Sequence, residues 1–507
     1  MKKTVFYIMI ITIVSKIIGF AREIILSYFY GASIVSDAYL ISITIPSTIF
    51  GFILVGIIAS YIPMHSKISE NTGEAEANKF TNNVINILLL LSTIVIVISY
   101  VFAGKIVSIF ASGFEGYAYD LTIKFTRISL LAIYFTGLVS VFSGHLQMKG
   151  NYIIPALIGF PLNLFILISI LLSKVTNIYM LSFGYVIAVA SQLVLLIPFV
   201  LKSGYVHKLT IRFKDENIIK LLKMSLPVII GTSVNQINVL VDRTLASQIT
   251  VGGISALNYA NRLGGFIQGI FVSSIVTVLY PTISKMSAGK NSKNLKKSLN
   301  SSMVSIMLLV VPATFGFMLF SHEIISLLFG RGAFDVKATQ LTSSALFYYS
   351  FGMTGIGLRE ITSRFFYSMH DTKTPMINAA IGMVLNILLN FILSKYLGIG
   401  GLALATSISA TITLILMLIT LRKKVGPLGL ISTFNAFVKI VFASIIMGLL
   451  AKKLLLFMMG SGFNLNSSLI ISIILGAFIY MIIILFMRIE EMDVIIKSIR
   501  KKFTTEK

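Results

Sequence analysis

The chain has 507 residues, of which 56% are hydrophobic and 12% are charged, with a formal net charge of +24. An ordinary soluble domain has about 25% charged residues, roughly twice the fraction found in this chain. That low charged fraction and the mean hydropathy of +0.93 exclude an ordinary soluble domain. Cysteine is absent and the five histidines are scattered, which excludes disulfides, thiolate metal sites and a histidine zinc cluster. These features predict a multi-pass membrane protein.

The first apolar run begins near Val5 and contains charged residues that hydrocarbon does not tolerate without a reason. Lys16, Arg22 and Glu23 interrupt it, and Asp37 follows near the start of the second run. An ionisable group near the bilayer centre costs about 2.5–3.5 kcal/mol on insertion scales, so such groups usually face a bundle interior or an aqueous cavity. We therefore predict a retained first helix, and not a cleaved signal peptide, beside a polar and mostly cationic cavity.

Apolar runs of about 20 residues recur along the chain, each long enough to cross a hydrocarbon core as a helix. Short alternating strands of the barrel type are absent. We predict an all-α polytopic membrane protein with about fourteen spans. These begin near Val5, Asp37, Val84, Arg127, Ile153, Ile178, Ile219, Ile254, Leu299, Leu341, Thr374, Gly400, Phe434 and Ser468.

The positive charge is concentrated in loops, including residues 202–223, 285–297 and 422–424. Lysine and arginine accumulate in the cytoplasmic loops of membrane proteins, which places both termini in the cytoplasm. No soluble domain or basic arm is large enough to grip a duplex, so we predict no nucleic-acid partner.

An internal repeat divides the chain into two halves. Aligning Asp37 with Ser255 also aligns Tyr61-Ile62-Pro63 with Leu279-Tyr280-Pro281 without a gap. Two repeats of six helices keep one orientation in the membrane, an arrangement found in alternating-access transporters. The predicted organisation is an N-terminal lobe (1–203), a cytoplasmic linker (204–218), a C-terminal lobe (219–424), an extra helix pair (425–489) and a basic tail (490–507).

Several motifs of distinctive order and spacing occur along the chain. The most specific segment runs from Phe329 to Pro375 and contains Phe329-Gly330-Arg331-Gly332-Ala333-Phe334 and Met369-His370-Asp371-Thr372-Lys373-Thr374-Pro375. Others are Gly19-Phe20-Ala21-Arg22-Glu23, Ser36-Asp37-Ala38-Tyr39, Pro161-Leu162-Asn163, Val241-Asp242 and Tyr259-Ala260-Asn261-Arg262-Leu263. With these motifs the chain closely resembles the MviN/MurJ family of lipid II flippases, within the multidrug/oligosaccharidyl-lipid/polysaccharide exporter superfamily. The resemblance covers essentially the whole chain.

This resemblance implies a flippase in the bacterial plasma membrane. Its substrate would be lipid II, the undecaprenyl-diphosphate-linked precursor of peptidoglycan, moved from the inner to the outer leaflet. It implies a cationic cavity between two lobes and a groove for the polyprenyl tail beside the last two helices. Implied partners are the glycolipid, membrane lipids and enzymes of cell-wall synthesis.

Three basic residues are the predicted substrate contacts. Arg22 and Arg262 match family arginines of the central cavity, and Lys16 stands where the family usually has arginine. A diphosphate must lose hydration on entering the bundle, and charge-assisted hydrogen bonds from arginine replace it. The alternative is a structural role, in which Lys16 and Arg22 pair with Glu23 or Asp37, or reach to an interface. Asp37 has two interpretations, a gating residue or a structural residue that caps the second helix or pairs with an arginine.

The sequence departs from the family pattern where charges are usual. Phe50-Gly51 and Val55-Gly56 replace an arginine pair and a glutamate-glycine step, and Gly265 replaces a glutamate. The charged side chains that are missing here include both positive and negative ones, so they could be lost as ion pairs without changing the fold. These departures therefore weaken the assignment of the substrate more than that of the fold. A flippase for another undecaprenyl-linked polysaccharide therefore stays open, as do a cation-coupled drug exporter and a non-transporting scaffold for wall-synthesis enzymes.

Two further polar groups lie within predicted spans. Asp242, Asn386, Asn390 and Thr406 match a sodium site described in the family, and oxygen ligands with one carboxylate suit a hard cation. Interhelical hydrogen bonding is the alternative. The second group is Arg359, Glu360 and Arg364, in which Glu360 and Arg364 are spaced to pair along one helix face. A structural pair is the favoured interpretation of this group, and a substrate contact is the alternative.

Enzyme chemistry has no support in the sequence. No nucleophile elbow, P-loop or zinc motif stands in a suitable context. We predict a transporter without a cofactor, with sodium as a candidate coupling ion.

Overall fold

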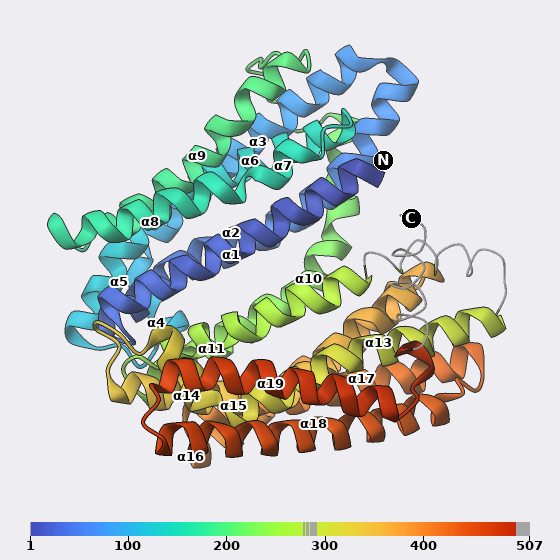
Figure 1. Ribbon diagram of the computed structural model, residues 1–507. Helices are drawn as coiled ribbons and strands as arrows, with labels where there is room; N and C mark the ends of the chain where they lie inside the picture. Colours follow the sequence, from blue (N-terminus) through green and yellow to red (C-terminus); the bar gives the residue numbers. More distant parts are fainter. Residues whose placement is uncertain (1, 277–278, 280–282, 284–291, 493–507) are drawn as a thin grey trace. The chain divides into compact units, whose positions relative to one another are not determined.

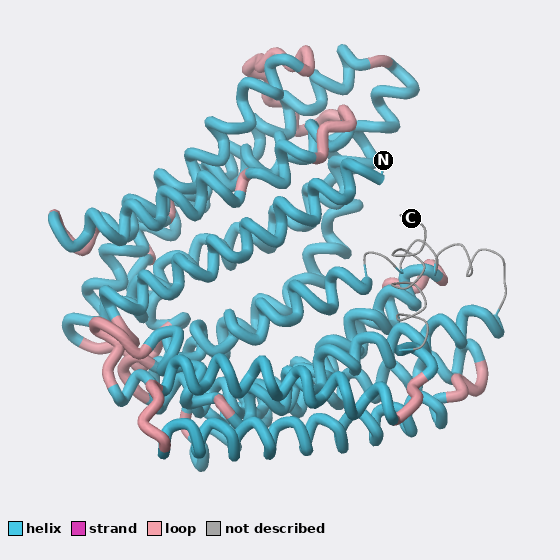
Figure 2. The backbone as a smooth tube through the Cα atoms, viewed as in Figure 1, coloured by secondary structure: helices cyan, strands magenta, loops and turns pink. Residues whose placement is uncertain are grey.

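The computed structural model describes residues 2–276, 279, 283 and 292–492. Within these residues every regular element is a helix, and no strand is present (Figure 1). Loops are short and lie at helix ends (Figure 2). This follows from the sequence, because in hydrocarbon the backbone N–H and C=O groups must bond to one another, and a helix satisfies them within one segment.

Ten of the described helices are long and apolar enough to cross a membrane. The bent pair α5 (Gly116–Ser129) and α6 (Ala132–Met148), with an angle of 42° between its members, adds an eleventh candidate. The prediction of an all-α, multi-pass membrane protein is confirmed. The number fourteen stays a prediction.

The chain divides into two compact units. The first comprises Met1–Ser255 together with Arg331–Asp335, and the second comprises Ala256–Gly330 and Val336–Lys507. Each is described by itself below. The lobe and linker boundaries drawn from the repeat stay a prediction.

The first unit is organised around α2 (Ile34–Thr72), a helix of 39 residues with Pro46 and Pro63 inside it. It packs against α3, α5, α6 and α10, and its buried side chains include Phe50 and Tyr61. The remaining helices of this unit are α1 (Lys2–Tyr30), α3 (Glu74–Val101), α4 (Ala103–Phe110), α7 (Ile153–Leu157), α8 (Gly159–Val175), α9 (Met180–Lys202) and α10 (Glu216–Ile249).

The second unit is organised around α15 (Val336–Ser368), which packs against α13, α14 and α17. Phe365 and Phe366 of α15 are fully buried in its core. The other helices are α11 (Gly253–Ile267), which starts in the first unit, η1 (Gln268–Val272), α13 (Ser292–Leu319), α14 (Ser321–Phe329), α16 (Lys373–Leu397), α17 (Ile399–Val425), α18 (Leu430–Gly460) and α19 (Leu465–Phe486). α18 packs against both α13 and α19.

The short segment 331–335 belongs to the first unit because its backbone contacts the end of α1. Ala333 N–H donates to the Tyr28 carbonyl oxygen over 2.8 Å. Gly31, at φ +59°, lies so close that a Cβ there would sit 2.3 Å from the Ala333 oxygen. Gly332, at φ +64°, meets the Tyr28 oxygen in the same way. Both positions therefore require glycine, for the left-handed backbone and for the close approach.

Candidate functional site

Arg22 of α1 is held by two side chains of the first unit. Its Nη2 lies 2.7 Å from Glu23 Oε1, and its Nη1 donates to Asn163 Oδ1 over 3.1 Å. The Glu23 side chain is 2% exposed, whereas that of Arg22 is 17% exposed. A guanidinium has five N–H donors, and these two bonds use only two of them. The structure describes no other hydrogen bond from Arg22, so these two bonds set the orientation of its guanidinium.

Asn163 of α8 is a positioning residue that the sequence interpretation did not single out. Its Nδ2 donates to the Gly159 oxygen over 2.8 Å and is 3.4 Å from the Ser15 oxygen, which directs Oδ1 toward Arg22. The side chain is buried. Asn163 belongs to a segment that carries the family resemblance, but its role depends on a contact across 141 residues. No local pattern reveals such a contact.

Lys16 and Arg262 are both exposed. Lys16 has no hydrogen bond or ion pair with any residue that the structure describes, and α1 continues through Gly19 without a break. Six positions along an unbroken helix place Lys16 and Arg22 on different faces. Arg262 lies on α11, in the second unit. The substrate role of all three basic residues stays a prediction.

Asp37 caps a helix other than its own. Its carboxylate accepts from Gly252 N–H (2.7 Å), Ser255 N–H (2.8 Å) and Ser255 Oγ (2.5 Å), at the first turn of α11. Asp37 is 1% exposed. The start of α2 is capped instead by Ser36 Oγ, which accepts from Ser33 N–H over 2.9 Å. A carboxylate at a helix N-terminus is favourable because it meets unpaired N–H groups and the positive end of the dipole.

The predicted pair within α15 is present. Arg364 Nη2 lies 2.6 Å from Glu360 Oε1, and both side chains are partly exposed. The Arg364 guanidinium also lies 5.9 Å from the centre of the Tyr367 ring. These contacts are those of a structural pair along one helix face. Arg359 precedes the pair and is partly buried.

The residues of the predicted sodium site form hydrogen bonds in the second unit. Asn386 Nδ2 donates to Thr406 Oγ1 (3.3 Å), and Asn390 Nδ2 donates to Asn386 Oδ1 (3.0 Å). Asp242 lies on α10, in the first unit. Across the described ranges, no group of three histidine, aspartate or glutamate residues could hold a metal ion. The bond from Asn386 joins α16 to α17, as interhelical hydrogen bonding would, whereas the bond from Asn390 to Asn386 lies within α16. The ion site stays a prediction.

The turn between α15 and α16 carries the aspartate of the most specific motif. Asp371 forms an ion pair with Lys424 at the end of α17, and its Oδ1 accepts from Thr374 N–H over 2.9 Å. Burial alone would raise the pKa of Asp371, but the bonds from Lys424 and Thr374 outweigh it and lower the pKa to about 2. The carboxylate is therefore ionised near neutral pH and ties this turn to α17.

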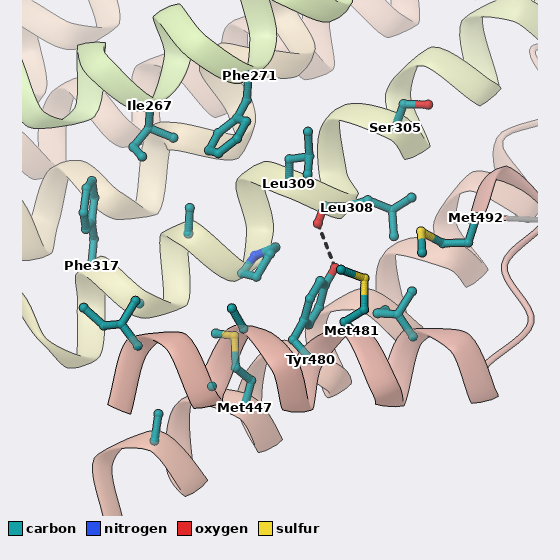
Figure 3. A pocket seen from close by; sticks show the side chains of 18 of the residues that line it. Ile267, Phe271, Ser305, Leu308, Leu309, Phe317, Met447, Tyr480, Met481 and Met492 are labelled. Carbon is teal, nitrogen blue, oxygen red and sulfur yellow. Dashed lines mark hydrogen bonds between the residues drawn. The ribbon is translucent and has the colours of Figure 1, made fainter. Parts of the chain in front are cut away.

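A large apolar groove lies within the second unit, with a volume of about 1040 Å³. It runs along α13 and is bordered by α18 and α19, and its lining is almost entirely hydrocarbon (Figure 3). Tyr480 points from α19 toward α13, where its hydroxyl donates to the Leu308 oxygen over 2.9 Å. Other lining residues are Ile267, Phe271, Leu309, Gly316, Phe317, Met447 and Met481. Such a groove fits an extended apolar chain.

Comparison with known proteins identifies the family. The family model described as "Lipid II flippase MurJ" matches residues 26–492. The chain belongs to the MurJ family. A probable lipid II flippase MurJ of Thermotoga maritima is 29% identical over 487 residues, which is 96% of each chain. The family's members are flippases and not catalytic enzymes, as the sequence predicted.

Solved structures agree with this MurJ assignment. A structure described as "Lipid II flippase MurJ, inward closed conformation" is 28% identical with a TM-score of 0.83, and the match covers 96% of this chain and 99% of that one. An inward-facing multidrug resistance MATE family transporter is 17% identical with a TM-score of 0.65, over 82% of this chain and 95% of that one. The second likeness shows a shared fold.

Proposed function

We propose that this protein moves lipid II from the inner to the outer leaflet of a bacterial plasma membrane by alternating access. The observation that carries the proposal is the match to the lipid II flippase family over residues 26–492. The relatives named above are described as lipid II flippases or probable ones. No step of covalent chemistry is needed, because translocation changes only the position of the lipid.

Arg22 supplies the contact to the diphosphate in this proposal. Its guanidinium already donates to Glu23 and Asn163, so its orientation is set before the lipid arrives. Its other N–H donors suit two phosphate oxygens of one group, and such charge-assisted bonds replace the hydration lost on entry. Arg262 and Lys16 add positive charge for the same ligand. Asp37 contributes by holding the first turn of α11, the helix that carries Arg262 further along.

The polyprenyl tail occupies the apolar groove of the second unit. A tail of this kind is uncharged, and the groove beside α13, α18 and α19 offers it an almost wholly apolar surface. Burying apolar chain surface there is favourable by about 25 cal/mol per Å². In this proposal the basic loops and both termini face the cytoplasm. Sodium is a candidate coupling ion, and enzymes of wall synthesis are candidate partners.

A rescue experiment tests the proposal. We expect the full chain to restore growth to a strain depleted of its lipid II flippase, and the purified protein to bind lipid II over phosphatidylglycerol in native mass spectrometry. A second candidate, another undecaprenyl-linked polysaccharide unit, is favoured by the uncharged residues Phe50, Val55 and Gly265 at positions where charges are usual. No rescue by a well-expressed protein, with no preference for lipid II, would support that candidate instead.

Filling the groove should block the lipid tail without unfolding the protein. Gly316 of α13 lines the groove, and a Cβ added there meets no atom within 4 Å. We expect Gly316→Phe to reduce lipid II binding and rescue at least tenfold while the protein remains folded, because the ring takes space needed by the tail. Gly316→Ala is the matched control, since it adds one methyl group and favours the helix by about 0.5–1 kcal/mol. Equal binding by both variants would place the tail elsewhere.

A further inference from the structure

The segment between α9 and α10 is fixed to α3 by its backbone. Residues 205–212 form no helix, yet three buried asparagines of α3 donate to four of their carbonyl oxygens. The bonds run from Asn82 Nδ2 to the Val206 oxygen (3.1 Å), from Asn86 Nδ2 to the Lys208 (2.9 Å) and Thr210 (3.0 Å) oxygens, and from Asn83 Nδ2 to the Arg212 oxygen (3.0 Å). Carbonyls of alternate residues point to one side when a backbone is extended. We call this segment the linker strand (residues 205–212); the name describes its alternating carbonyl bonds, and it is not a β-strand.

Between residues 208 and 212 the linker strand separates apolar from basic side chains. In an extended chain alternate side chains share a face, so Leu209 and Ile211 lie on one face, with Lys208 and Arg212 on the other. The pattern does not extend to the start of the segment, where Val206 is exposed and Tyr205 is buried. Leu209 is 89% exposed and Ile211 is 49% exposed, while Lys208 and Arg212 are also exposed. The side chains of Leu209 and Ile211 are thus exposed on a segment whose backbone is fixed by buried asparagine amides.

The position of the linker strand in the chain indicates that its apolar face meets lipid. α9 and α10, which flank it, are both long and apolar enough to span a membrane. The strand therefore lies at one surface of the bilayer. Exposed apolar residues continue from it into both helices, at Leu201 in α9 and at Ile219 and Leu222 in α10. An apolar surface continuous with lipid-facing helices suits lipid better than a soluble partner.

The charges near the linker strand favour anionic lipid. Lys208, Arg212 and Lys214 are exposed, and the two acidic residues that follow are already engaged. Asp215 caps α10 through a 2.8 Å bond from Asn217 N–H, and Glu216 pairs with Lys220 at 3.1 Å. Basic residues beside an anionic membrane surface gain attraction, and apolar residues beside them enter the boundary between headgroups and acyl chains.

We propose that the linker strand is a membrane-surface anchor: Leu209 and Ile211 insert below the headgroups, and Lys208 and Arg212 bind the phosphates of anionic phospholipids. The anchor fixes the connection between α9 and α10 to the bilayer plane and to α3 together. This inference does not depend on lipid II as the transported substrate.

Spin labelling tests the anchor in the 507-residue chain, which contains no cysteine to compete for the label. The labelled variants are Leu209→Cys, on the apolar face, and Thr210→Cys, on the opposite face as the matched control. Each is reconstituted in vesicles of phosphatidylcholine with or without phosphatidylglycerol. Power saturation then compares accessibility to oxygen, which enters hydrocarbon, and to a water-soluble nickel chelate. We expect the label at 209, but not at 210, to favour oxygen, and to lie deeper when phosphatidylglycerol is present.

A charge variant completes the test. Adding Lys208→Gln and Arg212→Gln to Leu209→Cys should remove the effect of phosphatidylglycerol on depth. Equal exposure of both labels to the chelate would overturn the anchor. Protection of the label at 209 from both reagents would overturn it in favour of a protein partner. A depth that ignores phosphatidylglycerol in the unmodified background would overturn the headgroup contacts.

Discussion

Arg22→Ala should abolish rescue of a flippase-depleted strain and weaken lipid II binding by about 30-fold or more. Removing one partner of a desolvated charged contact costs about 2–5 kcal/mol, and each 1.4 kcal/mol is a factor of ten in Kd. Arg22→Lys keeps the charge but loses the planar fork that Asn163 and Glu23 orient, so its binding should be intermediate. Native mass spectrometry with lipid II measures the binding.

The control for Arg22→Ala must separate binding from folding. Truncation removes the ion pair between Arg22 and the Glu23 carboxylate, which is 2% exposed, and breaking a buried ion pair is itself destabilising. Adding Glu23→Gln removes that charge. The double variant should therefore recover expression and thermal stability but not lipid II binding. Recovery of binding and rescue in the double variant would show that Arg22 serves only to neutralise Glu23.

Asp37→Ala should lower the free energy of unfolding by about 3 kcal/mol or more. It leaves two backbone N–H groups and one hydroxyl of the first turn of α11 without their acceptor, and each buried unsatisfied group costs about 1–3 kcal/mol. Thermal unfolding of the purified protein in detergent measures the change. Transport should fall as well, because α11 also carries Arg262.

Two milder variants should reduce the free energy of unfolding less than Asp37→Ala does. Ser255→Ala removes the hydroxyl and keeps both backbone bonds, so it should have the smallest effect. Asp37→Asn keeps one acceptor oxygen but places an amide donor against a backbone N–H, so it should be intermediate. If Asp37→Ala melts at the temperature of the unmodified protein, the cap does not hold α11.

Much of this fold follows from composition and local spacing. Long apolar runs leave helices as the only way to satisfy backbone groups in hydrocarbon, and the four-residue spacing of Glu360 and Arg364 is enough to predict their ion pair. The adjacent Arg22 and Glu23 likewise pair as one of the predicted alternatives. These features depend on residues close in the sequence.

The rest depends on contacts between distant segments. Asp37 meets residues more than 200 positions away, so no local pattern could show that it caps α11 and not α2. Asn163 acquires its role only when α8 lies beside α1. The groove is formed by the surfaces of several helices, and its lining residues resemble any lipid-facing residues in the sequence.

The contact between Asp37 and Ser255 bears on how such a chain could arise. The internal repeat places these two residues at the same position of its two copies, and in the structure they bind each other. In an assembly of two identical subunits, this position would have to bind itself, and two aspartates would bring like charges together. Fusion of the copies into one gene lets each mutate alone, so one could become the acceptor and the other the donor. A pair of aspartate and serine at equivalent positions requires two copies that differ in sequence. A duplicated and fused gene provides such copies, and a homodimer does not.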